Sequence, residues 1–482
     1  MDHPVIRDSV RDSLGLIDRF PRWGLSPVSA LTIGLGTLFV QYDIFNINVS
    51  FVQTCQALVD GCTPQTADQH IGLPILLSLI GYAVGALSLG PLADRFGRHK
   101  LLIVSMAITG FGSLYSMLSG DYSDFVASRF VTGIGVGADL AIINVYVSEV
   151  APRRLRGGYT GLMFVLASIG SALGIWLGLL LTTPSTPWPD GLPLAQASAS
   201  FDDGWRWIYG IGAVLALFSL LLRFSLPESP RWLVAHGRVE TAEVVIEEMR
   251  LRATRRHGLL PPEADAADVA GEQTASTGTV EAVGELFRSR RYLSRLALLS
   301  LSWMLAYLTV YAFAGAFTSV LVRLDHTVAS AGMVSAVGLV GFIVAALVAR
   351  SLTDRLDRKW WMLLGAVIAV VGAMLVSYGG TSGWPVFAGA LVLFFGQNLW
   401  FPAQYALTAE SFPTRSRATG YAITDSIGHV GGGVGVFFLV GALDKLPFQG
   451  TMLVLVAFLL AGGLVNLSAP RTRNRALEAI ST

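Results

Sequence analysis

Charged residues are scarce in this sequence, at 14% of its 482 residues. A soluble protein carries about a quarter, so this composition argues against a soluble globular chain. Hydrophobic residues instead reach 53%, and the mean hydropathy is +0.58. The net charge of +1 gives no strong field of either sign. We therefore expect no nucleic-acid partner.

The sequence also lacks the signatures of an ATP-driven pump and of an enzyme. No glycine-rich loop ends in Lys followed by Ser or Thr, the pattern that cradles nucleotide phosphates. No nucleophile and base stand in a recognisable catalytic spacing. We expect no enzymatic activity, no cofactor and no metal site.

Long apolar runs are the main feature that is present. A helix needs about 20 apolar residues to cross ~30 Å of hydrocarbon. The chain has two sets of six such runs, at about 28–51, 72–92, 101–119, 124–147, 158–182, 205–226, 295–320, 329–350, 360–380, 385–408, 418–441 and 449–469. We predict an all-α membrane protein with twelve transmembrane helices in two pseudo-symmetric six-helix bundles.

Two charged motifs occur twice, once in each half. The sequence Leu-Ala-Asp-Arg-Phe-Gly-Arg begins at Leu92, and Leu-Thr-Asp-Arg-Leu-Asp-Arg begins at Leu352. The pattern E-x-x-P-x-x-x-R begins at Glu149 and again at Glu410. The first pair is 260 residues apart and the second 261, which indicates an internal duplication. Many secondary transporters are built from such repeats.

Basic residues gather in alternate loops, and acidic residues occupy the loops between them. The basic loops hold Arg95, Arg98 and Lys100, then Arg153, Arg154 and Arg156, then Arg355, Arg358 and Lys359, then Arg415 and Arg417. Cytoplasmic loops carry such an excess, so we expect both termini in the cytoplasm and the protein in the cell (plasma) membrane. The expected division is a cytoplasmic segment (1–27), a first bundle (28–226), a polar cytoplasmic linker with short helices (227–292), a second bundle (293–470) and a cytoplasmic tail (471–482).

The two cysteines of the chain, Cys55 and Cys62, fall in the first loop on the expected outer side. That compartment permits a disulfide. The spacing leaves two free thiols as the alternative, because spacing alone does not fix the geometry.

The loop motif from Gly90 to Lys100 resembles the signature between helices 2 and 3 of the major facilitator superfamily. Arg129–Gly137, Glu149–Gly157 and Pro227–Leu233 resemble further motifs of its sugar porters and related symporters. The resemblance implies two six-helix bundles, a central substrate site and rocking alternating access. It also implies a conformational latch made by the repeated loop motifs, with the candidates Asp94, Arg95, Arg98, Glu149, Arg156, Asp354, Arg355, Arg358, Glu410 and Arg417. The alternative is that these residues only fix the topology.

Asp43, Arg129 and Asp139 are ionisable residues within the apolar runs of the first half, where charge is costly and tends to be functional. Asp43 lies about 12 Å from the outer end of its run, and Arg129 about 8 Å from the outer end of its own, at ~1.5 Å per residue. The depths suit an ion pair that protonation of Asp43 would open; a static pair between two helices is the alternative. Asp139 lies deeper in the same run as Arg129 and is a second candidate proton carrier, or a structural carboxylate.

The segments around Asp43 and Asp139 resemble the phosphate:proton symporters more than the sugar porters. The chain departs from that group at Leu140, Tyr307 and His429, where the group has Tyr, Asp and Lys, and it lacks the Gln of helix 5 that both groups use. The sequence therefore points to a small polar metabolite. Its candidate binding residues are Trp303, Tyr307, Tyr311, Gln397, Asn398, Asp425 and His429. Packing between helices is the alternative for each of them.

We expect a proton-coupled uptake symporter for a small metabolite, with an organic anion as the first choice because His429 would suit one when protonated. A sugar or polyol porter is the alternative within the same class. A transporter-like nutrient sensor is the alternative of another class. The expected partners are the small-molecule substrate, protons and the lipid bilayer, and the expected state is a monomer.

Overall fold

In the computed structural model, the described residues are 14–472, without 15, 19, 21, 153–155, 255–283, 285, 381–382, 413–416 and 443–445. This part of the chain is almost entirely helical. Twelve of its helical spans are long and apolar enough to cross a membrane, six before residue 227 and six after residue 289. The expected fold class is confirmed. The outer and inner ends of the bundles are named here by the orientation that the arginine distribution predicts.

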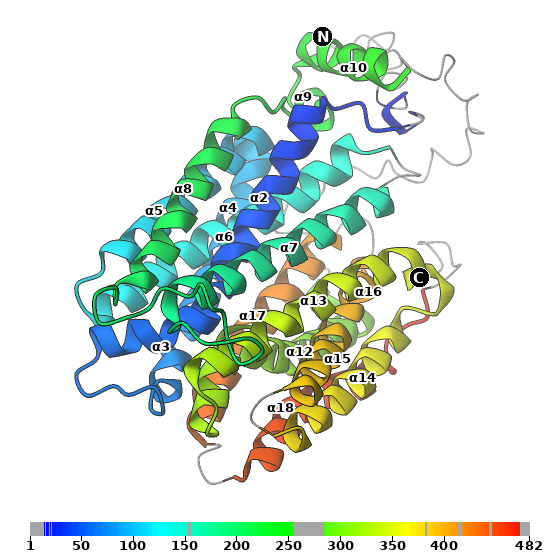
Figure 1. Cartoon of the computed structure of the whole chain (residues 1–482). Helices are drawn as coiled ribbons and strands as arrows, with labels where there is room; N and C mark the ends of the chain where they lie inside the picture. The colour runs from blue at the N-terminus through cyan, green and yellow to red at the C-terminus, as the bar shows by residue number, and fades with distance from the viewer. Residues whose placement is uncertain are drawn as a thin grey trace.

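The N-terminal bundle contains the helices α2 (Pro27–Phe45), α3 (Ile47–Leu58), α4 (Asp68–Phe96), α5 (Arg98–Leu118), α6 (Tyr122–Val150), α7 (Arg156–Thr182) and α8 (Gly204–Arg223). The C-terminal bundle contains α12 (Arg290–Arg323), α13 (Val328–Leu352), the short 3-10 helix η4 (Thr353–Arg355), α14 (Lys359–Tyr378), α15 (Trp384–Leu399), α16 (Phe401–Glu410), α17 (Arg417–Ala442) and α18 (Phe448–Asn466). Figure 1 shows the first bundle in blue to green and the second in green to red. They meet where α7 packs on α13 and α4 packs on α17.

Two of the apolar runs predicted as membrane spans each contain a helix break. The first breaks at Asn46, which separates α2 from α3. The tenth breaks at Trp400, where Pro402 follows in the first turn of α16. Proline lacks the backbone N–H that a continuous helix uses. Breaks inside a bilayer are tolerated where the freed backbone groups face protein or a cavity, so both breaks mark positions near the centre of the molecule.

Two short helices follow the first bundle on the inner side. Helix α9 (Pro230–Ala235) is capped by the Ser229 side chain, and α10 (Val239–Thr254) follows it. On α10, Arg250 donates hydrogen bonds of 2.6 and 2.7 Å to both carboxylate oxygens of Glu247. These bonds hold the pKa of the Glu247 carboxyl below its usual range. Most of the rest of the expected linker, and the end of the expected tail, lie outside the described residues, so the domain boundaries stay predictions.

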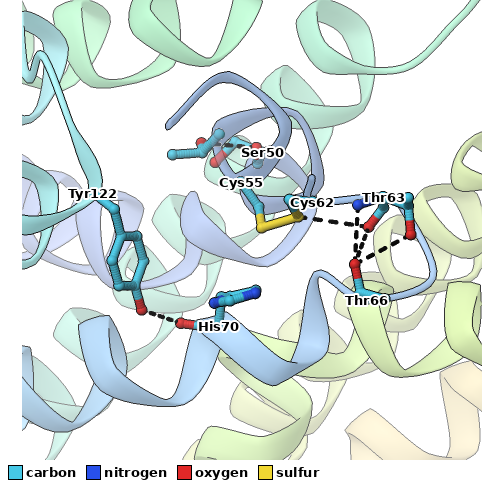
Figure 2. Close-up of a disulfide and its surroundings, with 8 residues drawn as sticks. Ser50, Cys55, Cys62, Thr63, Thr66, His70 and Tyr122 are labelled. Carbon is cyan, nitrogen blue, oxygen red and sulfur yellow. Dashed lines mark hydrogen bonds between the residues drawn. A yellow bond between two sulfur atoms is a disulfide. The ribbon is translucent and has the colours of Figure 1, made fainter. Parts of the chain in front are cut away.

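A disulfide joins Cys55 to Cys62 at the outer end of α3, with 6.0 Å between the Cα atoms (Figure 2). The turn beyond it is held by Thr66, whose hydroxyl accepts a 2.9 Å bond from the Thr63 backbone N–H. Nearby, the Tyr122 hydroxyl donates to the His70 carbonyl and joins α6 to α4. The outer mouth of the N-terminal bundle is thus bordered by a cross-linked loop.

Polar contacts join the two bundles at their outer ends. Asn48 of α3 donates 2.8 Å hydrogen bonds to the carbonyls of Phe313 and Ala314 of α12, and its Oδ1 accepts a 2.6 Å bond from Thr318. Asp68 of α4 forms a 2.9 Å ion pair with Arg323 of α12. Because these contacts cross from one bundle to the other, they close the outer side of the molecule in this conformation.

Candidate functional site

Asp43 and Arg129 form a buried ion pair next to the break between α2 and α3. The Arg129 Nη1 lies 3.2 Å from Asp43 Oδ2, and its Nη2 donates a 2.9 Å bond to the Asp43 carbonyl. Ser113 of α5 donates a 2.7 Å bond to Asp43 Oδ1. The helix break explains part of this geometry, because carbonyls in the last turn of a helix lack their usual partners. Arg129 therefore binds both the charge of Asp43 and its backbone.

Glycines bring α6 close enough to α4 for this arrangement. A Cβ atom at Gly133 would overlap the carbonyl of Ser78, and one at Gly137 would overlap the carbonyl of Tyr82. Small residues allow such close approach of helices in a membrane. Gly133 and Gly137 of α6 therefore determine how closely Tyr82 of α4 approaches the helix that carries Arg129.

A small cavity lies between the ion pair and the boundary of the bundles. Its volume is about 30 Å³, which suits a water molecule and not a sugar. Its lining comes from both bundles and includes Arg129 and Tyr82 from the first and Tyr311 and Gly315 from the second. Arg129 thus contacts the proton-binding candidate on one side and the central cavity on the other.

Aromatic side chains of the C-terminal bundle surround the carboxylate of Asp425. The rings of Trp303, Tyr307 and Tyr311 follow one another along α12, with centroids 4.8 and 5.5 Å apart. The Tyr307 hydroxyl lies 3.3 Å from Asp425 Oδ1 and 3.3 Å from the Tyr405 hydroxyl. All but Tyr405 are buried. Of these three predicted binding residues, Tyr307 contacts Asp425 directly, and Trp303 and Tyr311 pack on either side of Tyr307.

His429 lies one turn after Asp425 on α17 and packs among the same rings. Its Nδ1 is 3.4 Å from Asp425 Oδ1 and 2.8 Å from the Asp425 carbonyl. Its ring stacks on Tyr82 of α4, with centroids 3.8 Å apart and an angle of 10° between the planes. Two of the predicted binding residues, Asp425 and His429, therefore contact each other, and His429 also contacts the other bundle.

The two amides of α15 have different surroundings. The Asn398 amide donates a 2.7 Å bond to the Phe342 carbonyl and a 3.1 Å bond to Ser168 of α7, so it joins helices to one another. The Nε2 of Gln397 is buried and has no hydrogen-bond partner among the described residues. The Gln397 amide donor is therefore unpaired among the described contacts, whereas the Asn398 amide bonds to two partners.

Asp139 is paired with a residue that the sequence analysis did not single out. Arg223, at the inner end of α8, donates a 2.9 Å bond from Nη2 to Asp139 Oδ2, and its Nη1 contacts Oδ1. Ser105 of α5 donates a further 2.8 Å bond to Asp139. Both charged side chains are buried, at 0% and 1% exposure. Asp139 is not among the residues that line the central cavity.

The loop motif of the first half forms a network within its own bundle. Arg98 donates to Asp94 at 2.7 Å and to Glu149 at 2.9 Å. Glu228, which precedes α9, accepts bonds of 3.0 and 3.2 Å from the backbone N–H groups of Arg98 and His99. Arg95 instead packs over the Phe96 ring, with its Cζ 5.3 Å from the centroid. In this conformation the network links α4, α5 and α6 to the segment before α9.

In the second half, Arg358 pairs with Glu410 and donates a 3.2 Å bond to Thr472. Arg355 is exposed at the end of η4, and Arg417 begins α17. The side chains of Arg156 and Asp354 lie outside the described part of the chain. The latch role of all these residues stays a prediction.

The model of the family described as "Sugar (and other) transporter" matches residues 29–482. The chain belongs to this family.

Relatives and solved structures agree with the sugar transporter family. A D-xylose transporter of Levilactobacillus brevis is 27% identical over 415 residues, which cover 83% of this chain and 84% of that protein. A glucose transport protein of Synechocystis sp. is 28% identical over 395 residues, with 75% and 78% covered. The xylose transporter XylE of E. coli, described in one structure as a proton:xylose symporter, matches with a TM-score of 0.69 at 21% identity and covers 94% and 98% of the two chains.

Membership of the sugar transporter family confirms several expectations. The protein is a multi-pass membrane transporter of the major facilitator superfamily with a small-molecule substrate, and it is not an enzyme. For the substrate, these matches favour the sugar alternative over the organic anion that the sequence departures suggested. Among the described residues, no group of three or more His, Cys, Asp and Glu side chains is arranged to hold a metal ion.

Tyr82 and Arg223 are two of the residues that sequence reasoning missed and that the structure brings next to the predicted ones. Tyr82 carries no charge and lies outside every motif, so only the structure reveals its contact with Asp425. Arg223 has a weak signal, because it lies near the end of an apolar run and arginines there usually mark the membrane interface. A deep acid such as Asp139 needs a cationic partner, and this need is the one signal that would have directed attention to Arg223.

Proposed function

We propose that the protein is a proton-coupled importer of a sugar or polyol. The proposal rests on the buried Asp43–Arg129 pair, whose arginine also lines the central cavity. A charged pair at this depth is costly to keep and strongly destabilising to break by removing one partner. A proton is a ligand that neutralises Asp43 without removing a side chain. We infer that Arg129 couples the binding of a proton to Asp43 with the binding of substrate in the central cavity.

The steps of the cycle follow from the contacts. In this structure Arg129 is held by Asp43, and the outer ends of the bundles are joined by Asn48 and the Asp68–Arg323 pair. Opening to the outside separates these outer contacts and exposes the cavity. A proton on Asp43 then removes the negative charge that holds Arg129, and its guanidinium turns toward the substrate. Closure around both ligands, followed by opening to the inside, releases them together.

The choice of a sugar or polyol is supported by the chemistry of the centre and by the printed names of the relatives. Aromatic rings and tyrosine hydroxyls suit a ligand with an apolar face and a rim of hydroxyls. The relatives described as D-xylose and glucose transporters point to the same class.

The test is uptake of D-xylose and D-glucose by proteoliposomes that are acidic outside. We expect the wild-type protein to accumulate at least one of the two above its external concentration. Asp43→Asn mimics the protonated carboxyl permanently, so we expect it to exchange labelled for unlabelled sugar across the membrane without accumulating sugar. The matched control is Asp60→Asn, which removes an exposed carboxylate at the outer loop and should leave accumulation unchanged.

Equal accumulation by the wild-type protein and Asp43→Asn would show that Asp43 carries no proton in the cycle. Equilibration without accumulation in both would indicate a facilitator. Binding of sugar without any flux would favour the sensor.

An organic anion is the second candidate, and one observation favours it. His429 lies at the centre and would attract an anion when doubly protonated. Including D-gluconate, the acid that corresponds to D-glucose, in the same uptake panel separates the two candidates. Accumulation of gluconate in preference to glucose would select the anion.

A further inference from the structure

Tyr82 is the one aromatic side chain of the N-terminal bundle that both stacks on and hydrogen-bonds to the centre of the C-terminal bundle, among the contacts that the structure describes. Its hydroxyl donates a 3.0 Å bond to Asp425 Oδ2, and its ring stacks on His429. It extends from α4, whereas both partners lie on α17. Any movement that separates α4 from α17 must therefore break both contacts, so Tyr82 leaves Asp425 when the bundles part at this point.

Every group described as bonded to the Asp425 carboxylate is a hydrogen-bond donor. Tyr82 donates to one oxygen, and Tyr307 donates to the other at 3.3 Å. The Nδ1 atom of His429 faces two oxygens of Asp425, one from the carboxylate and one from the backbone. Because both are acceptors, Nδ1 carries a proton. A carboxylate in this setting accepts further donors and repels a second anion.

The cavity beside this cluster is too small for a sugar while Tyr82 stays in place. Tyr82 and Tyr311 line opposite sides of the boundary, and the space between them measures about 30 Å³. Tyr82 is 5% exposed and Asp425 is 4% exposed. A substrate hydroxyl that takes the place of the Tyr82 hydroxyl on Asp425 must therefore displace the Tyr82 side chain.

We propose that Tyr82 is a stand-in for the substrate: it occupies the sugar position in the closed state, and a substrate hydroxyl replaces its hydroxyl on Asp425. The flat ring on His429 and the single hydroxyl on a carboxylate are the two contacts that a pyranose would make there. This inference rests on the proposed function and adds to it the residue that sets the substrate class. Asp425 makes the site accept neutral hydroxyl donors and reject carboxylates.

The experiment measures equilibrium binding of D-glucose, D-xylose and D-gluconate to the purified full-length protein by calorimetry. For the wild-type protein we expect binding of a neutral sugar and weaker binding of gluconate. Asp425→Asn keeps the shape and removes the charge. We expect it to weaken sugar binding on the order of 10- to 100-fold, the usual range for losing a hydrogen bond to a charged group, and to reduce the preference over gluconate.

The variant Tyr82→Phe tests whether Tyr82 competes with the substrate for Asp425 or binds the substrate itself. It keeps the ring on His429 and removes the hydroxyl that competes for Asp425. We expect sugar to bind tighter, on the order of tenfold, because a hydrogen bond to the charged carboxylate no longer opposes it. The matched control is Tyr122→Phe, which removes the bond to the His70 carbonyl within the N-terminal bundle (Figure 2) and should leave affinity unchanged.

The outcomes separate this inference from the proposed function. Weaker sugar binding by Tyr82→Phe would make Tyr82 a direct ligand and overturn the stand-in role. Unchanged sugar affinity in Asp425→Asn would overturn the role of Asp425, while uptake driven by the proton gradient would still support sugar symport. A wild-type protein that binds gluconate and neither sugar would overturn both.

Discussion

Arg223 holds Asp139 in the interior of the N-terminal bundle, where neither side chain reaches solvent. Both members of the other buried pair, Asp43 and Arg129, could be predicted from the sequence, because each lies well inside an apolar run at a matching depth. Arg223 could not, because an arginine near the end of an apolar run normally marks the end of a span. Which role a deep acid plays depends on the partner that the fold brings to it, and a linear sequence does not show that partner.

Replacing Asp139 by Asn should destabilise the protein without abolishing its response to a pH gradient. The change leaves the buried charge of Arg223 without its counter-charge, which costs about 3–5 kcal/mol. We expect a marked fall in the unfolding temperature in detergent. Substituting both residues, as Asp139→Asn with Arg223→Met, should recover part of that loss, because the unpaired charge is gone.

The comparison of the wild-type protein with these two variants decides the role of Asp139. The fraction of protein that still folds should accumulate sugar under a pH gradient. A stable Asp139→Asn variant that exchanges sugar but fails to accumulate it would instead make Asp139 a proton carrier.

The twelve spans illustrate how far hydropathy determines the elements. The second span was expected at about 72–92 and extends over Asp68–Phe96, since polar ends of a helix do not raise the hydropathy. The first and tenth spans were expected as continuous and instead break at Asn46 and Trp400. Hydropathy registers side chains and not backbone hydrogen bonds, so a break inside an apolar run escapes it.

The loop between α4 and α5 shows why the two copies of the charged motif differ. Gly97 has a φ of 104°, a backbone conformation that L side chains rarely adopt. A Cβ there would overlap the Glu228 carboxylate. The equivalent residue in the second copy is Asp357, and there the chain follows the short helix η4 with an extended Leu356. The departure in sequence therefore reflects a different loop conformation.

Gly97→Ala should destabilise the protein more than Gly237→Ala does. Both glycines have positive φ, at 104° and 72°, and Gly237 has no atom within 4 Å of the position of a Cβ. The alanine at 237 therefore measures backbone strain alone, about 1–2 kcal/mol. The alanine at 97 adds displacement of Glu228 from the Arg98 and His99 backbone. Thermal unfolding of both variants checks this, and equal losses would show that Glu228 moves aside freely.

At the scale of the whole molecule, the outer contacts between the bundles determine which side is open. The Asp68–Arg323 pair and the Asn48 bonds all cross from the first bundle to α12. They have to break whenever the molecule opens outward. Removing one of them should therefore shift the population toward the outward-open state.

Asp68→Asn should increase the exposure of the central cavity to the outside. Both native cysteines are joined in a disulfide, so a single Ser78→Cys substitution in the cavity lining provides one free thiol. We expect a membrane-impermeant maleimide, added outside, to label this thiol several times faster in Asp68→Asn than in its absence. The control is Asp203→Asn, whose carboxylate pairs with Arg206 within the same bundle.

Equal labelling rates with and without Asp68→Asn would show that this ion pair does not hold the outer side closed. Faster labelling in Asp203→Asn as well would point to a general loosening of the outer surface.

The two bundles contribute different chemistry to the centre. The first contributes the paired charges of Asp43 and Arg129, and the second contributes Asp425, His429 and their aromatic neighbours. Under the proposed function, the first half of the gene encodes proton coupling and the second half encodes most of the substrate specificity. During evolution, mutations in the second half can therefore change the transported substrate while the proton-coupling residues stay the same.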